Sequence, residues 1–359
     1  MENQTSISND QWAKILSSGS FLCWRGSWWF FAGLSPLTNF KNNKENQLVI
    51  FDFFGSGASP YQAQRVFGPL SSASLRESIT EYLSGLKPEN IPFSWFPPQQ
   101  EDFLKSFSSV MDKIIHGEIK KAVPISFLEG RGQLGPFQLA QFILKLCDAP
   151  ETLIPYGFWH EDSGFIGATP EILYSRFEDQ FETMALAGTA PQDFSNSQDL
   201  LNDPKERHEH QLVIQDIQEK LFNLVDLNFA PTTILELPHL RHLHTAVRGR
   251  IQDFKMTNDL EIIQRLHPTS ALGVYPRQHG IDWLQSLPQQ KERKNFGAPI
   301  LYNLPDGNVI TLVGLRRLEW SKQDIRIGAG CGLVRESIFA REWLEVTRKI
   351  ESVRKLLGI

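Results

Sequence analysis

The sequence predicts an α+β fold that forms one large domain. Strand-like runs of alternating apolar residues are joined by turns of two to six residues, as in YSRFEDQFETMAL (174–186), and such hairpins build antiparallel sheets. Helix-like segments alternate with these strands. No GxxxxGK[ST] phosphate-binding loop is present. The 359 residues suffice for a sizeable core.

The N-terminal portion, residues 1–99, is expected to contribute strands to the same fold as the rest. It carries the aromatic runs FLCWRGSWWFFAGL (21–34) and QLVIFDFFG (47–55), which glycines interrupt. Four prolines and three aromatic residues between Pro88 and Glu101 indicate a connection to the second portion, residues 100–359.

Helices and strands alternate in the second portion. The apolar periodicity predicts helices over residues 100–117 and 137–147. Short apolar runs bounded by turn residues predict strands, which cover residues 121–127, 164–168, 172–176, 309–315 and 324–329.

Composition and charge exclude several classes of protein. Lysine and arginine number 36 against 41 acidic residues, and this net charge of −5 argues against nucleic acid or an anionic membrane as a partner. The longest apolar stretch (28–34) is far shorter than the roughly 18 residues of a membrane span, and the polar N-terminus does not resemble a secretory signal. Cys23, Cys147 and Cys331 are too scattered for a disulfide framework. We expect a soluble, cytoplasmic protein.

A predicted helix in NDPKERHEHQLVIQDIQEKLFNL (202–224) turns two carboxylates toward the core. Asp203 is placed as its N-cap, and Pro204 suits the first helical position. At about 100° per residue, Glu206 and Glu209 lie within the arc of the apolar residues. Glu206 also falls where a capping box has its acid, so one alternative is that it only caps the helix.

The C-terminal segment FAREWLEVTRKIESVRKLL (339–357) repeats this pattern with Glu342 and Glu345. An ionised carboxylate that faces the interior is costly unless a cation or several donors meet it. Two helices that each supply an inward Glu-x-x-Glu can hold a hard divalent cation, and we expect Mg²⁺. The alternative is that Glu345 is a rim charge. A zinc site is a weaker alternative, because it needs three converging ligands from the histidines at 208, 210, 239, 242 and 244.

Seven motifs in order resemble those of the chorismate-utilising enzymes, which include isochorismate, salicylate, anthranilate and aminodeoxychorismate synthases. The motifs are GATPEIL, ALAGT, DPKERHEHQLV, HLHT, LHPTSALG, the arginine of VGLR, and AGCGLVRESIFAREWLE. The match runs from about Asp112 to the C-terminus, while the N-terminal part matches only in general character. The resemblance implies a single chorismate-binding domain with two stacked antiparallel sheets flanked by helices, and it makes residues 100–359 the catalytic portion.

The resemblance also implies the residues of the site. Glu209 and Glu345 hold the magnesium, Glu206 and Glu342 assist, and the metal meets the ring carboxylate of chorismate. Arg316 clamps the pyruvyl carboxylate, which a planar guanidinium can bind through two hydrogen bonds. The other substrate-binding positions are Thr189, His267 and the turn of Gly330, Cys331 and Gly332, whose backbone N–H groups make an anion nest.

Two positions, Ala187 and Lys121, separate the branches of the family, and Glu171 matches an acid of the family as a whole. Ala187 stands where aminodeoxychorismate synthases carry a nucleophilic lysine. Lys121, in GEIKKAVPISF, matches the lysine with which isochorismate and salicylate synthases activate water, and amine-adding members carry glutamine there. Glu171, in GATPEIL, matches the general acid that protonates the departing C4 hydroxyl, a role that needs a raised pKa. The alternative is that Lys120 and Lys121 are an exposed basic pair.

The expected function is therefore a magnesium-dependent isochorismate synthase, an isomerase that serves menaquinone or siderophore biosynthesis. It would act without a glutaminase partner, as a monomer or weak homodimer. Salicylate synthase and the component I enzymes that make anthranilate or aminodeoxychorismate stay open as alternatives, as does a catalytically silent chorismate-binding protein. Silence is suggested by the altered glycine loop RKNFGAPIL, which has Phe296 and Leu301 where the family pattern has tyrosine and glycine. The other departures from that pattern are Pro124, Ser126 and Val274.

Overall fold

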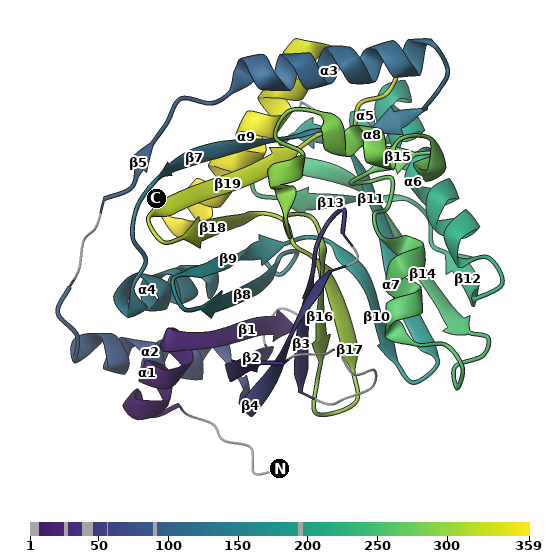
Figure 1. Ribbon diagram of the computed structural model, residues 1–359. Coiled ribbons are helices and arrows are strands. Elements are labelled where there is room, and N and C mark those ends of the chain that lie inside the picture. Colours follow the sequence, from purple (N-terminus) through teal and green to yellow (C-terminus); the bar gives the residue numbers. More distant parts are fainter. Residues whose placement is uncertain (1–6, 25–27, 38–45, 56, 89–91, 193–196) are drawn as a thin grey trace.

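The computed structural model describes residues 7–24, 28–37, 46–55, 57–88, 92–192 and 197–359 (Figure 1). It confirms an α+β fold of one domain. Its helices are α1 (Asn9–Ser17), α2 (Ser72–Ser84), α3 (Gln100–Ile115), α4 (Pro136–Leu146), α5 (Ser197–Asn202), α6 (Pro204–Leu221), α7 (Asp259–Leu266), α8 (Ile281–Ser286) and α9 (Phe339–Leu357). Among the described residues, no helix is long and apolar enough to cross a membrane.

Antiparallel pairing joins almost all described strands into one sheet of 17 strands. From one edge to the other, the strands are β5 (Ser94–Trp95), β7 (Ile125–Arg131), β19 (Asp324–Gly330), β18 (Arg317–Ser321), β9 (Ser163–Thr169), β8 (Ile154–His160), β1 (Ser18–Trp24), β2 (Trp28–Pro36), β4 (Ala58–Leu70), β3 (Gln47–Phe51), β16 (Pro299–Asn303), β17 (Val309–Val313), β10 (Ile172–Phe177), β11 (Gln180–Pro191), β14 (Leu240–Ile251), and then β12 (Val225–Phe229) and β13 (Thr233–Leu237) beside β14.

Two stacked sheets were expected, and this prediction is only partly matched. The aromatic strand β1 pairs with β2 on one side and with β8 on the other, so the two halves are continuous through backbone hydrogen bonds. Strand β3 likewise pairs with β16. These pairings incorporate the N-terminal strands into the same fold. In the connection between Pro88 and Glu101, residues 89–91 lie outside the described part, and β5 is its only described strand.

The predicted strand over residues 121–127 is interrupted. Lys121–Ala122 forms β6, which pairs with β15 (Val274–Tyr275), whereas β7 begins at Ile125 and pairs with β19. Pro124 lies between them, and a proline has no N–H to offer to a ladder. The break separates the lysine from the large sheet and leaves it on a short two-stranded ribbon.

The two helices with inward acids cover opposite ends of the strand order. Helix α6 packs against β11 and β14, and α9 packs against β19 and β7. Asp203 caps α6 by accepting a hydrogen bond from the backbone N–H of Glu206 at 3.0 Å, as predicted. Helix α9 ends at Gly358, whose φ of 71° is the left-handed conformation that glycine favours. Both helices bury their apolar faces, so their glutamates are carried into the interior.

Candidate active site

A cavity lies where the two ends of the strand order meet. Residues of β7 and β19 line it on one side, and residues of β11 and β14 line the other. Predicted site residues on its wall are Glu171, Thr189, Glu209, Arg316, Gly330, Cys331, Gly332 and Glu345. Ala187 also lines it, so the wall offers no lysine at that position.

Lys121 lies directly behind this wall. Its side chain has no exposed surface, and its Nζ is 3.0 Å from Glu209 Oε1. The alternative of an exposed basic pair is therefore wrong for Lys121, whereas Lys120 is exposed over the ring of Tyr275. Lys121 does not line the cavity itself. A side chain at Gly332 would overlap Glu209 Oε1 and approach the Lys121 Cε to 2.6 Å, so glycine permits this arrangement.

Glu171 is a buried acid on the wall of the cavity. It follows β9 and precedes β10, and its backbone is fixed by hydrogen bonds to Thr169 Oγ1 and from the Val313 N–H. The residue is 6% exposed. Burial raises the pKa of Glu171 to about 7, against the opposing influence of Lys121 and Lys349. A carboxyl with this pKa can donate a proton near neutral pH.

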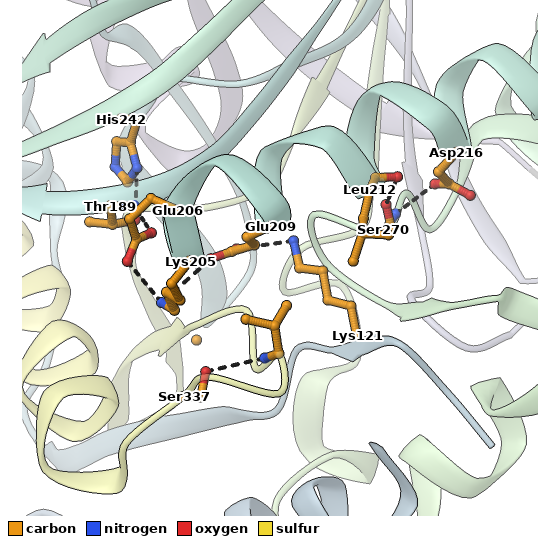
Figure 2. A network of polar contacts seen from close by, with 12 residues as sticks. Lys121, Thr189, Lys205, Glu206, Glu209, Leu212, Asp216, His242, Ser270 and Ser337 are labelled. Carbon is orange, nitrogen blue, oxygen red and sulfur yellow. Dashed lines mark hydrogen bonds and ion pairs between the residues drawn. The ribbon is translucent and has the colours of Figure 1, made fainter. Parts of the chain in front are cut away.

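Four glutamates from two helices form an acid cluster, which consists of Glu206 and Glu209 of α6 (Figure 2) and of Glu342 and Glu345 of α9. The Lys205 amine lies among them, 3.0 Å from Glu206 Oε1, 3.1 Å from Glu342 Oε1 and 3.7 Å from Glu209 Oε2. All four carboxylates are turned inward, as the helical periodicity predicted.

The side chain of Glu206 has a role other than capping the N-terminus of α6. Its carboxylate accepts a hydrogen bond from the Thr189 backbone N–H at 2.7 Å, so the side chain does not complete the capping box that its position suggested. Glu345 pairs with Lys349 at 2.6 Å, and the same amine donates to the Gly330 carbonyl at 2.8 Å. Lys349 thereby connects the acid cluster to the glycine-rich turn.

The acid cluster carries more negative charge than its neighbours balance. Burial and the adjacent Glu209 raise the pKa of Glu206, and burial and the adjacent Glu345 raise the pKa of Glu342. Burial alone would raise the pKa of Glu209, but Lys121 and Lys205 outweigh it and lower that pKa. Glu342 Oε2 is buried without a hydrogen-bond partner. The cluster is thus able to accept further positive charge.

A chain of polar contacts joins the cluster to Arg316. Thr189 Oγ1 lies 3.0 Å from His242 Nδ1, and His242 Nε2 lies 3.4 Å from a guanidinium nitrogen of Arg316. The other terminal nitrogen of Arg316 donates to Ser352 at 2.7 Å. Burial lowers the pKa of Arg316 to about 10. Burial also holds the pKa of His242 well below its usual value, and the nearby charges of Lys349 and Arg316 lower it further. Arg316 stays a cation beside a neutral imidazole.

His267 does not line this cavity, contrary to the expectation. Its Nε2 lies 3.0 Å from the Phe53 carbonyl, and its ring packs edge-on against Phe53, so the side chain is used in the core. The histidine-based zinc alternative also fails on placement. Among the described residues, no three His, Cys, Asp or Glu side chains are arranged so that they could hold a metal ion as they stand. Burial raises the pKa of the Cys331 thiol well above its usual value.

Several site residues were missed by the analysis of the sequence. Lys205 lies four residues before Glu209, and Lys349 lies four residues after Glu345, so helical periodicity alone could have placed both amines beside the acids. His242 was considered only as a possible zinc ligand. Arg293 is buried on the cavity wall and donates to the Leu272 carbonyl at 3.0 Å, for which the sequence holds no periodic signal.

The cavity combines a buried guanidinium, a protonatable glutamate and clustered carboxylates, which are groups typical of enzyme sites. The family model of chorismate binding enzymes matches residues 76–358. The chain belongs to the chorismate-binding enzyme family.

Known proteins agree with this membership. The chain is 33% identical to the salicylate biosynthesis isochorismate synthase of Pseudomonas aeruginosa over 63% of this chain and 48% of that protein. It is 26% identical to a probable anthranilate synthase component 1 of Schizosaccharomyces pombe over 70% of this chain and 53% of the other. The chain thus spans about half the length of these relatives.

Solved structures share the fold. The menaquinone-specific isochorismate synthase MenF of Escherichia coli superposes with a TM-score of 0.78 at 17% identity, over 96% of this chain and 90% of that one. DhbC of Bacillus anthracis superposes with the same TM-score at 20% identity, over 96% of both chains.

Proposed function

We propose that this protein is a magnesium-dependent isochorismate synthase, which converts chorismate to isochorismate for menaquinone or siderophore biosynthesis. The observation that carries the proposal is one cavity that brings together Glu171, Arg316 and Glu209, with the Lys121 amine 3.0 Å from Glu209. The chain matches relatives that are named as isochorismate synthases and relatives that are named as anthranilate synthases. The choice between these two activities therefore rests on the residues proposed to act on the ring.

The proposed reaction exchanges one hydroxyl for another. Lys121 takes a proton from water as the water oxygen bonds to C2 of the ring, the double bonds shift, and the C4–O bond breaks. Glu171 donates its proton to the departing hydroxyl, which leaves as water, so the composition of the substrate is unchanged. Lys121 can accept a proton only as the neutral amine, so it has to release its own proton before it takes one from water. The pKa of about 7 suits Glu171 to its role as the acid.

Magnesium is part of the proposal because the chemistry of the acid cluster suits it, although the carboxylates of the described residues would have to move closer together to hold the ion. Carboxylate oxygens are the ligands that Mg²⁺ prefers, and the cluster contains a buried, unpartnered oxygen at Glu342. Glu209 and Glu345 would hold the ion, and Glu206 and Glu342 would assist. When bound, it would supply positive charge to the ring carboxylate, while Arg316 holds the pyruvyl carboxylate.

The amine-adding alternatives are disfavoured by two side chains. Ala187 on the cavity wall provides no nucleophile for aminodeoxychorismate formation. Lys121 is buried next to the cavity, where amine-adding members of the family are expected to carry glutamine. Neither position calls for a glutaminase partner.

Incubation of the purified protein with chorismate and Mg²⁺, with and without ammonium, tests the proposal. Chromatography should identify isochorismate as the product in both cases, and a chelator should abolish its formation. Salicylate with pyruvate would identify a salicylate synthase, and an aminated ring would identify a component I enzyme. Unchanged chorismate under all conditions would identify a silent binding protein.

A further inference from the structure

The Lys205 amine occupies the centre of the acid cluster. It contacts the carboxylates of Glu206 and Glu209 on its own helix (Figure 2) and that of Glu342 on α9, at distances of 3.0–3.7 Å. Its side chain is only 18% exposed. Among the described residues, it is the lysine whose ion pairs join α6 to α9, because the other ion pairs of these glutamates are those of Lys121 with Glu209 and Lys349 with Glu345.

The charges show why this amine is needed in the absence of a metal. Four ionised glutamates would carry four negative charges, and Lys121 and Lys349 each meet only one carboxylate. Lys205 meets three. Without Lys205, no cation of the described residues would lie within ion-pair distance of Glu206 or Glu342. Unbalanced negative charges on α6 and α9 would oppose the packing of these two helices against each other.

The same oxygen atoms are those that the proposed function assigns to Mg²⁺. A magnesium ion draws its oxygen ligands to about 2.0–2.1 Å, whereas the amine holds them apart at about 3 Å. Two cations also repel each other when they share one set of ligands. Lys205 and the metal therefore cannot occupy the cluster together.

We propose that Lys205 is a built-in counter-ion of the acid cluster, which a divalent cation has to displace when it binds. The inference rests on the magnesium site of the proposed function. The displaced amine has a place to go, because a second cavity of about 300 Å³ is lined by Lys205 together with Asp203 and Glu336. A lysine side chain has four methylene groups, so its amine can turn into this cavity without movement of α6.

Metal binding to Lys205→Met tests the proposal, with calorimetry of Mg²⁺ alone on the full chain and thermal unfolding in chelator. Methionine keeps an unbranched apolar stem but carries no charge. The variant should bind Mg²⁺ at least tenfold more tightly than the wild type. In chelator its Tm should fall, and saturating Mg²⁺ should restore it. Lys105→Met is the matched control, because this exposed lysine of α3 pairs only with Asp102 and should change neither quantity.

Lys205→Arg keeps the experiment decisive if the methionine variant does not fold without metal. Arginine retains the charge and adds a forked donor for carboxylates, so this variant should fold in chelator and bind Mg²⁺ more weakly than the wild type. Equal or weaker Mg²⁺ binding by Lys205→Met, or tighter binding by Lys205→Arg, would overturn the displacement. That result leaves isochorismate formation by the wild type intact. If the wild type and Lys205→Met both fail to bind Mg²⁺, the magnesium assignment itself is wrong.

Discussion

Glu171 shows how burial alone prepares a single side chain for acid chemistry. Its pKa of about 7 predicts that kcat/KM falls above about pH 7, because the ionised carboxylate has no proton to give. Glu171→Gln should lower the rate by about 10²–10⁴-fold and should remove this alkaline limb from the pH profile of the residual activity. A profile that keeps the limb in the variant would assign it to another group.

Lys121 is the residue on which the choice of branch depends. Lys121→Gln should reduce isochorismate formation by about 10²–10⁴-fold, since glutamine cannot accept a proton from water. Added ammonium should then yield a trace of aminated product. Lys120→Gln is the control, because Lys120 is exposed over the ring of Tyr275 and its substitution should leave the rate unchanged. A near-normal rate for Lys121→Gln would mean that water is activated elsewhere.

For individual residues, the sequence predicted which acids turn toward the interior better than it predicted their contact partners. The inward direction of Glu206, Glu209, Glu342 and Glu345 follows from helical geometry, which is local. The partner of an inward charge depends on tertiary packing, so neither the contact of Lys121 with Glu209 nor the use of His267 in the core could be derived from spacing.

Among the elements, the turn after β19 sets how closely the large sheet approaches α6. Gly332→Ala would place a methyl group against Glu209 Oε1 and Lys121 Cε, so both side chains would have to move. Because misplacement of about 1 Å can cost 10²-fold, activity should fall by about 10²-fold while the protein remains folded. Circular dichroism and the rate of isochorismate formation measure the two effects. Gly57→Ala should be neutral, because no atom lies within 4 Å of the added methyl group.

Helix α6 and the strand with the lysine illustrate the limits of prediction for elements. The N-cap at Asp203 and the buried face of α6 depend on neighbouring residues only, and the structure confirms both. The predicted strand over residues 121–127 is divided because each part finds a different partner, β15 or β19. Proline at 124 signalled an irregularity but not which strands would pair.

Across the whole molecule, one histidine connects the two portions of the chain. His267 contacts the Phe53 carbonyl, 214 positions away, and burial lowers its pKa to about 3. The unfolded chain takes up a proton near pH 6.5 but the folded one does not, so this contribution to stability is complete above pH 6.5 and is lost as the pH falls. Between pH 6.5 and 4.5, the wild type should lose about 2 kcal/mol more stability than His267→Gln. Urea unfolding at both pH values measures this difference, and equal losses would contradict it.

The sequence could not predict that the strands form one continuous sheet, because this depends on pairing between strands that are far apart in the chain. Aromatic composition predicted strands in residues 1–99, but the pairing of β1 with β8 joins residues more than 130 positions apart. Such long-range pairings decide whether two layers are separate sheets or one sheet. The local pattern of β1 is compatible with either arrangement.

The contact between Arg316 and His242 fixes the position of a hydrogen atom. A guanidinium can only donate, so the Nε2 of the neutral imidazole must be the acceptor and its single N–H must lie on Nδ1. That N–H points at Thr189 Oγ1, which leaves the hydroxyl hydrogen of Thr189 unused in this contact. The tautomer of His242 thus turns Thr189 into a hydrogen-bond donor on the cavity wall, ready for an oxygen atom of a ligand.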